Sequence, residues 1–124
     1  MLNYDDAIKN CNNKNGKLFE PKSLGTNKNV YEEAVASFGD LLNIDEYGYF
    51  ANRIWIGIND IANEDNFEYD NSGDSISIDS WDTGQPDNYG NNEDCVEFAY
   101  YNKDKWNDAD CSKTSLSICE ATGM

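Results

Sequence analysis

The chain has 124 residues, of which 24 are acidic and nine are basic, and its formal net charge is −15. This length predicts one domain, residues 1–124, that can bury a hydrophobic core, since 39% of the residues are hydrophobic. The negative charge argues against nucleic-acid binding, which needs a basic surface to displace counterions from phosphates. No apolar run approaches the roughly 20 residues of a membrane span, so we expect no membrane insertion.

Two helices are predicted in the first part of the chain. Asn3 supplies a cap and is followed by acidic residues that suit a helix start, and Gly16 ends this short helix. A second helix is expected to begin near residues 27–29 and to run to about Leu42, because its apolar residues recur at helical spacing. Both helices would pack their apolar sides on a core.

Short strands are predicted in the rest of the chain. Residues 54–58 form an apolar run of strand length, consistent with a strand that is buried on both faces. Residues 59–94 are rich in Asn, Asp, Gly and Ser, which predicts a long loop, and a long loop inside a compact domain is usually functional. Further strands are expected at 95–100, 105–108 and 115–120. Two early helices and a few late strands indicate the α+β class.

The chain has four cysteines, which permit three disulfide pairings. It has no histidine and no C-x-x-C pair, which argues against a structural zinc site. Disulfides are therefore expected, and they imply a secreted or extracellular protein. The alternative is four free thiols in a cytosolic protein.

Side chains that end in an amide or carboxylate oxygen gather in the last third of the chain. Calcium takes about six to eight oxygen ligands, so a cluster of such side chains predicts a calcium site. Three of the five side chains in this cluster are acids, whose negative charge would neutralise the ion. The alternative is a set of solvated loop side chains. The predicted ligands of this principal site are Gln85, Asp87, Glu93, Asn107 and Asp108.

Four short motifs occur in a fixed order along the chain, together with the four cysteines. They are Trp-Ile-Gly-Ile at 55–58, Gln-Pro-Asp at 85–87, Glu-Asp-Cys at 93–95 and Trp-Asn-Asp at 106–108. In this combination they resemble the C-type lectin-like domain, and the resemblance covers nearly the whole chain. It implies a fold in which two helices flank small antiparallel sheets and a long loop binds calcium.

The resemblance also implies specific covalent features. It pairs Cys11 with Cys119 and Cys95 with Cys111, and it implies a cis peptide bond before Pro86. The family usually begins with a strand pair, whereas this chain begins almost at the first helix. Either those residues have been removed, or the chain is a compact variant whose closing strand near Ile118 has an unpaired edge. Such an edge could pair with another chain in a homo-oligomer.

A sugar would bind directly to the calcium ion if the resemblance holds. Two neighbouring hydroxyls would each bind the ion, accept a hydrogen bond from an amide and donate one to a carboxylate. Gln85 and Asn107 would supply the amide donors, and Asp87 and Glu93 the carboxylate acceptors. Asp108 would add negative charge at the ion.

The order of Gln85 and Asp87 implies the kind of sugar. In the family, Gln-Pro-Asp goes with galactose-type sugars such as N-acetylgalactosamine, and Glu-Pro-Asn goes with mannose-type sugars. Galactose has an apolar face that packs on an aromatic ring, and Tyr89 is the predicted stacking residue. Mannose or fucose binding is the alternative.

A second, accessory calcium site is also implied. Its expected ligands are Asp60, Glu64, Asn88 and Asp94, and it would share Glu93 with the principal site. The amide of Asn88 stands where the family often has an acid, and an amide oxygen can still coordinate calcium. The alternative is a group of acidic loop residues that hold no ion.

Two other classes of function compete with sugar binding. The same fold can bind ice or a protein, with calcium serving only to order the loop. An enzyme is not expected, because a chain without histidine cannot form a Ser-His-Asp or Cys-His arrangement and acids held on calcium are poor proton donors.

Overall fold

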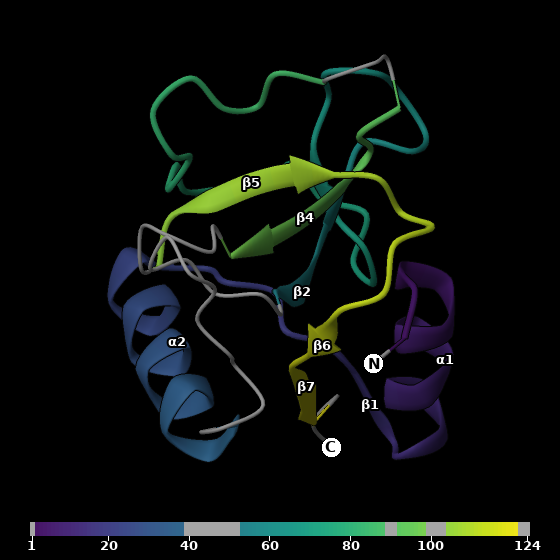
Figure 1. Cartoon of the computed structure of the whole chain (residues 1–124), viewed down its shortest axis with the longest axis vertical. Coiled ribbons are helices and arrows are strands. Elements are labelled where there is room, and N and C mark those ends of the chain that lie inside the picture. Colours follow the sequence, from purple (N-terminus) through teal and green to yellow (C-terminus); the bar gives the residue numbers. More distant parts are fainter. Residues whose placement is uncertain (1, 39–52, 89–91, 99–103, 122–124) are drawn as a thin grey trace, which may run out of the picture.

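The structure is a computed structural model that describes residues 2–38, 53–88, 92–98 and 104–121. Figure 1 shows two helices on opposite sides of a group of short strands, with the long loop at the top of the view. The elements are α1 (Tyr4–Asn13), β1 (Gly16–Leu18), α2 (Leu24–Phe38), β2 (Ile54–Asn59), β3 (Glu68–Tyr69), β4 (Cys95–Phe98), β5 (Trp106–Ala109), β6 (Leu116–Ser117) and β7 (Cys119–Ala121). The predicted α+β class is confirmed.

Helix α1 begins where the sequence predicted. The side chain of Asn3 accepts a hydrogen bond from the backbone N–H of Asp6 at 2.9 Å, which satisfies one of the free donors of the first turn. The helix buries Tyr4, Ala7 and Cys11 on one side. It therefore packs through a narrow apolar face, as expected.

Helix α2 begins earlier than predicted. It starts at Leu24 because Ser23 caps it, with the Ser23 hydroxyl accepting the backbone N–H of Thr26 at 3.1 Å. The start was predicted from the apolar face of the helix. Leu24 is 55% exposed and does not contribute to that face, so the pattern did not indicate the first turn. The predicted end at Leu42 lies outside the described residues.

Strand β2 is the centre of the larger sheet. The strand order is β3-β2-β4-β5 with antiparallel pairs, and β6 pairs with β2 in parallel. Every residue of β2 is buried. Ile54, Ile56 and Ile58 enter a core cluster that faces α2, whereas Trp55 enters a second cluster with residues of α1. The prediction of a strand buried on both faces is confirmed.

Strand β1 was not predicted from the sequence. It pairs with β7 as an antiparallel two-stranded sheet, with Gly16 opposite Ala121. A Cβ atom at Gly16 would lie 2.6 Å from the backbone oxygen of Glu120, so glycine is needed for this close pairing. The closing strand thus has a strand partner on one edge. Its second edge has no strand partner among the described residues.

Both disulfide pairings implied by the resemblance are confirmed. Cys11 is bonded to Cys119 and Cys95 to Cys111, which leaves no free cysteine. The peptide bond between Gln85 and Pro86 is cis, also as implied. Among the described residues, no helix combines the length and the apolar character needed to cross a membrane.

The long loop is more ordered than its composition suggested. It contains β3, and Phe67 and Trp81 turn inward, with their rings 4.8 Å apart. Trp81 also lies edge-on to Trp106, the first residue of β5, at 5.5 Å. The loop is therefore attached to the sheet through aromatic packing.

Candidate functional site

The sheet topology brings acidic residues together at the ends of β2 and β4. Because these strands are antiparallel, the end of β2 lies beside the start of β4, and Asn59 is paired with Cys95. Asp60 follows β2 and Asp94 precedes β4, and the backbone N–H of Asp60 donates to the backbone oxygen of Asp94 at 3.0 Å. These strand ends hold acidic side chains close together on the loop side of the sheet.

The first acidic cluster contains Asp87, Glu93 and Asp108. One carboxylate oxygen from each of these residues lies within 4.8 Å of the others. The three come from different segments: the loop after the cis peptide, the approach to β4, and β5 itself. Asp108 is paired with Val96 on β4 and is fully buried, whereas Asp87 is exposed. The cluster therefore has a fixed base and an open side.

Asp108 holds the loop around the cluster in place. Its two carboxylate oxygens accept the backbone N–H groups of Asp87 at 3.1 Å and of Asn88 at 2.7 Å. Asn88 has a positive φ of 46° and its side-chain oxygen accepts the backbone N–H of Glu93 at 3.1 Å. The chain from Asp87 to Glu93 is thus tied at both ends.

The two predicted amides adjoin this cluster. When the amide of Gln85 is oriented to satisfy its neighbours, its nitrogen lies 2.7 Å from Asp108 Oδ1, 3.3 Å from Asp87 Oδ1 and 2.9 Å from Asn107 Oδ1. A half-turn of the amide would present its oxygen instead. All five predicted residues of the principal site therefore lie in one group of oxygen-rich side chains, a donor set that suits calcium.

The electrostatics of the first cluster favour a cation. Burial raises the pKa of Asp108, while the backbone N–H groups of Asn88 and Asp87 act in the opposite direction. Asp87 also raises this pKa, because its negative charge repels that of Asp108. A positive ion near these oxygens would stabilise the ionised forms of both acids.

The second acidic cluster contains Asp60, Glu64 and Asp94, whose carboxylate oxygens also lie within 4.8 Å of one another. Asp60 Oδ2 accepts the backbone N–H of Asp65 at 2.8 Å, but Asp60 Oδ1 is buried and has no hydrogen-bond partner among the described residues. Burial, together with Glu64 and Asp94, raises the pKa of Asp60 to about 7. A buried acceptor without a donor is costly, and a cation would satisfy it.

The structure does not test the predicted roles of Asn88 and Glu93 in the accessory site. The contacts of Asn88 join it to Glu93 and Asp108, and Glu93 itself belongs to the first cluster. A role for Asn88 and a shared role for Glu93 in the accessory site stay predictions. Tyr89, the predicted sugar-stacking residue, lies outside the described residues.

The sequence did not indicate the contacts that attach the Gln85 segment to the sheet. The backbone N–H of Trp106 donates to Ser80 O at 2.8 Å, and that of Asp82 donates to Trp106 O at 2.9 Å. Asp82 O then accepts the backbone N–H of Gln85 at 2.9 Å. Serine and aspartate in a polar loop give no sign of such pairing, because backbone groups make these bonds.

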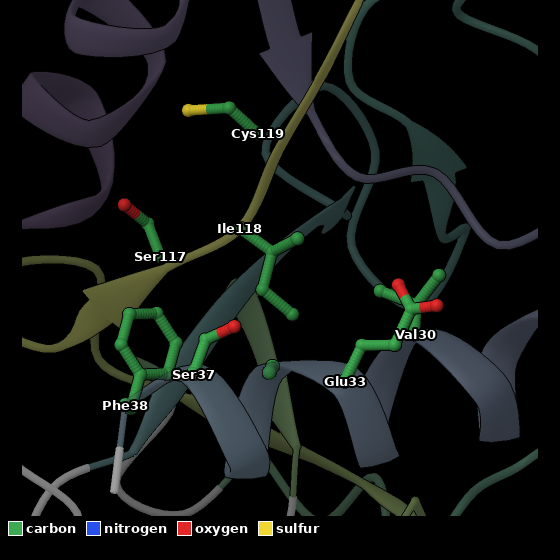
Figure 2. A pocket seen from close by; sticks show the side chains of 8 residues that line it. Val30, Glu33, Ser37, Phe38, Ser117, Ile118 and Cys119 are labelled. Carbon is green, nitrogen blue, oxygen red and sulfur yellow. The ribbon is translucent and has the colours of Figure 1, made fainter.

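A pocket of about 270 Å³ lies elsewhere, between α2 and the segment that enters β7. Figure 2 shows Ile118 pointing toward α2, with Val30 and Phe38 on the helix side. None of its lining residues belongs to either acidic cluster. We therefore place the candidate site at the clusters and not in this pocket.

Comparison with known proteins agrees with the motifs. The family model described as the lectin C-type domain matches residues 1–121. Collectin-10 from Xenopus tropicalis is 36% identical over 118 residues, which cover 95% of this chain and 38% of the relative. The chain thus spans about two-fifths of that relative's length.

A second relative matches a shorter region at higher identity. The alpha-N-acetylgalactosamine-specific lectin of Patiria pectinifera is 41% identical over 69 residues, which cover 54% of this chain and 40% of the relative.

Among solved structures, the carbohydrate-recognition domain of the mouse scavenger receptor C-type lectin has a TM-score of 0.76 at 24% identity. That match covers 95% of this chain and 81% of the other, and it shows that the fold is shared. With a family model over nearly its whole length, this chain belongs to the C-type lectin domain family.

Proposed function

We propose that this domain, residues 1–124, binds carbohydrate in a calcium-dependent manner and that its ligands are galactose-type sugars, including N-acetylgalactosamine. The observation that carries the proposal is the first acidic cluster, in which oxygens of Asp87, Glu93 and Asp108 lie within 4.8 Å of one another beside the Gln85 amide. Members of this family generally bind calcium and carbohydrate, and this cluster supplies the oxygen ligands that calcium requires.

The side chains of the cluster divide between holding the ion and orienting the sugar. Gln85, Asp87, Glu93, Asn107 and Asp108 would hold calcium, which when bound accepts a lone pair from each of two neighbouring sugar hydroxyls. Gln85 and Asn107 would donate amide N–H hydrogen bonds to those hydroxyls, and Asp87 and Glu93 would accept hydrogen bonds from them. The exposure of Asp87 on the open side of the cluster agrees with contact to a ligand from solvent.

The preference for galactose rests on the order of amide and acid in the Gln-Pro-Asp segment. A mannose-type order would exchange a donor for an acceptor at Gln85 and Asp87, and so would pair poorly with the same hydroxyls. A relative whose name specifies alpha-N-acetylgalactosamine agrees with this preference. Tyr89 would complete the site by packing on the apolar face of the sugar.

The second cluster is proposed as an accessory calcium site. Asp60, Glu64 and Asp94 would hold the ion with help from Asn88 and Glu93, and the unpartnered Asp60 Oδ1 would become a ligand. An ion there would stabilise the start of β4 and the loop that follows β2. Its contribution to sugar binding would be indirect.

We propose binding without catalysis, in a secreted or extracellular protein. The chain has no histidine, and acids that hold calcium are poor proton donors. Two disulfides agree with an oxidising compartment. Single-site affinity for a monosaccharide at an open, solvated site should be on the order of millimolar, so a homo-oligomer would raise the effective affinity for clustered glycans.

A glycan array with and without calcium tests the proposal. We expect binding to terminal galactose or N-acetylgalactosamine that disappears in EDTA and returns when calcium is restored. Binding that persists in EDTA would overturn the calcium mechanism, and a preference for mannose or fucose would overturn the sugar assignment. Calcium binding by calorimetry without any glycan signal would indicate an ice-binding or protein-binding member.

A further inference from the structure

The side chain of Asn27 connects three parts of the fold. It lies in the first turn of α2 and is 0% exposed. Its oxygen accepts the indole N–H of Trp106 at 2.9 Å, and its nitrogen donates to Asp104 O at 2.9 Å and to Ser80 Oγ at 3.3 Å. One buried amide therefore uses its acceptor and both donors on groups from outside its own helix.

The partners of Asn27 lie at the base of the two segments that carry the predicted ligands. Trp106 begins β5 and is followed directly by Asn107 and Asp108. Ser80 begins the segment that pairs with Trp106 and continues through Asp82 to the cis peptide after Gln85. The two segments are joined at their base by the contacts around Asn27 and at their far end by the bonds from Asp87 and Asn88 to Asp108.

We infer that Asn27 is a positioning residue that sets the spacing of the two ligand-bearing segments, an inference that rests on the proposed calcium site. Calcium ligands must converge at about 2.3–2.6 Å from the ion, so a small shift of one segment against the other weakens binding. Asn27 contacts neither cluster in the described structure and acts through the indole of Trp106 and the hydroxyl of Ser80. Its buried amide is hydrogen-bonded to three other residues and so provides a fixed reference for both segments.

Calcium affinity of an Asn27→Ala variant tests the inference. Loss of the buried amide leaves the Trp106 N–H without its acceptor and leaves Asp104 O with only the Ser80 hydroxyl as donor. We therefore expect calcium binding to weaken by about tenfold in calorimetric titration. Calcium affinity within about twofold of the wild type would overturn the inference. If the wild-type domain itself binds no calcium, the proposed function fails and the inference falls with it, so the two failures are distinguishable.

Tyr69→Phe is a matched control for a loss of stability alone. The Tyr69 hydroxyl is buried, donates to Pro21 O at 2.5 Å and is bonded to Ser77 Oγ at 2.9 Å, so it also joins the approach to α2 to the long loop. Neither Pro21 nor Ser77 is followed directly by a predicted calcium ligand. We expect this variant to lower the melting temperature in EDTA without changing calcium affinity. An equal loss of calcium affinity in the control would show that Asn27 acts only through general stability.

Two further variants test whether Asn27 acts through Trp106, and they keep the inference testable if Asn27→Ala does not fold. Asn27→Asp keeps the acceptor for Trp106 but loses both donors, and Trp106→Phe keeps an aromatic ring but loses the indole N–H. We expect each to weaken calcium binding, and we expect the Asn27→Ala and Trp106→Phe double variant to lose less than the sum of the single losses. Strict additivity would overturn action through Trp106.

Discussion

The carboxylate of Asp108 accepts the backbone N–H of Asn88 at 2.7 Å across a sequence separation of 20 residues. Its other oxygen accepts the backbone N–H of Asp87 at 3.1 Å. Asp108 therefore shapes the loop that carries Asp87 while also belonging to the same acidic cluster. Ligand placement and ligand chemistry are coupled at this one residue.

Asp108→Asn should weaken calcium binding by about 100-fold, because it removes a charged ligand. It also weakens one of the two hydrogen bonds to the loop and removes the other, since an amide NH₂ cannot accept a backbone N–H. Calorimetric titration with calcium measures the effect. Asp6→Asn, an exposed change on α1, removes the same charge at a distance and should leave the affinity unchanged. Equal affinities for the Asp108 variant and the wild type would contradict the proposed ligand set.

The sequence was sufficient to predict that the proposed calcium ligands lie close together, because these residues adjoin or belong to strands with clear apolar patterns. Asp60 and Asp94 adjoin the ends of paired strands, and Asp108 lies within a strand, so their convergence follows from antiparallel pairing. The start of α2 was placed too late, since an exposed Leu24 hides the first turn from apolar periodicity. The strands predicted at 54–58 and 105–108 agree with β2 and β5 to within one residue. The single closing strand predicted at 115–120 was wrong, because β6 and β7 are separate strands that pair with β2 and β1 in different sheets.

Other features depend on contacts between distant segments. Strand β1 has only three residues, and its pairing depends on β7, about a hundred residues away along the chain. Asn27 lies one turn before Val30 and Tyr31, on the face of α2 that meets the core. A polar residue at this apolar position was the only feature of the sequence that could have indicated a buried role for Asn27. Its partners could not be identified without the packed structure.

Asp60→Asn should stabilise the ion-free domain while reducing the stabilisation that calcium provides. The pKa of Asp60 is raised to about 7, so the unfolded chain releases its proton at lower pH than the folded one. The stability linked to this group is present below its ordinary pKa of about 4 and is lost as pH rises toward 7. At about pH 8 in EDTA, the asparagine variant should therefore be more stable by about 2 kcal/mol.

Urea unfolding in EDTA and in saturating calcium measures both parts of this prediction. Calcium should raise the stability of the wild type more than that of the Asp60 variant, because the variant loses a charged ligand. Asp74→Asn, an exposed change in the same loop, is the matched control and should have little effect on either quantity. A variant that is less stable than the wild type in EDTA would contradict the assignment.

Glu97→Gln should remove a pH dependence of the stability of the calcium-free domain. Glu97 is buried on β4 with its Oε2 3.1 Å from Arg53 Nε, and burial raises its pKa to about 8 although Arg53 acts in the opposite direction. The stability linked to this group is present below its ordinary pKa, about 4.5, and is lost as pH rises to about 8. The difference in unfolding free energy between variant and wild type should be near zero at about pH 4.5 and reach several kcal/mol in favour of the variant above about pH 8, with roughly 5 kcal/mol as the upper bound.

Urea unfolding in EDTA across this pH range measures that difference directly. Arg53 is partly exposed, with a third of its side chain accessible, so it can be solvated when its partner is neutral. Glu68→Gln, at a strand position that is not fully buried, is the control. A stability difference that stays constant with pH would show that Glu97 does not titrate in this window.

Exchanging the amide and acid at two positions, Gln85→Glu with Asp87→Asn, should shift the sugar preference from galactose toward mannose. The double variant keeps the number of oxygen ligands and the net charge, so calcium affinity should change by less than about threefold. What changes is the direction of the hydrogen bonds offered to the two sugar hydroxyls, since an amide donates where a carboxylate only accepts. Competition of immobilised galactose and mannose at a fixed calcium concentration measures the ratio of affinities, and each single variant serves as a control for charge alone. An unchanged ratio in the double variant would place specificity in the rest of the loop, because the acceptor and donor pattern at the ion would then have been reversed without consequence.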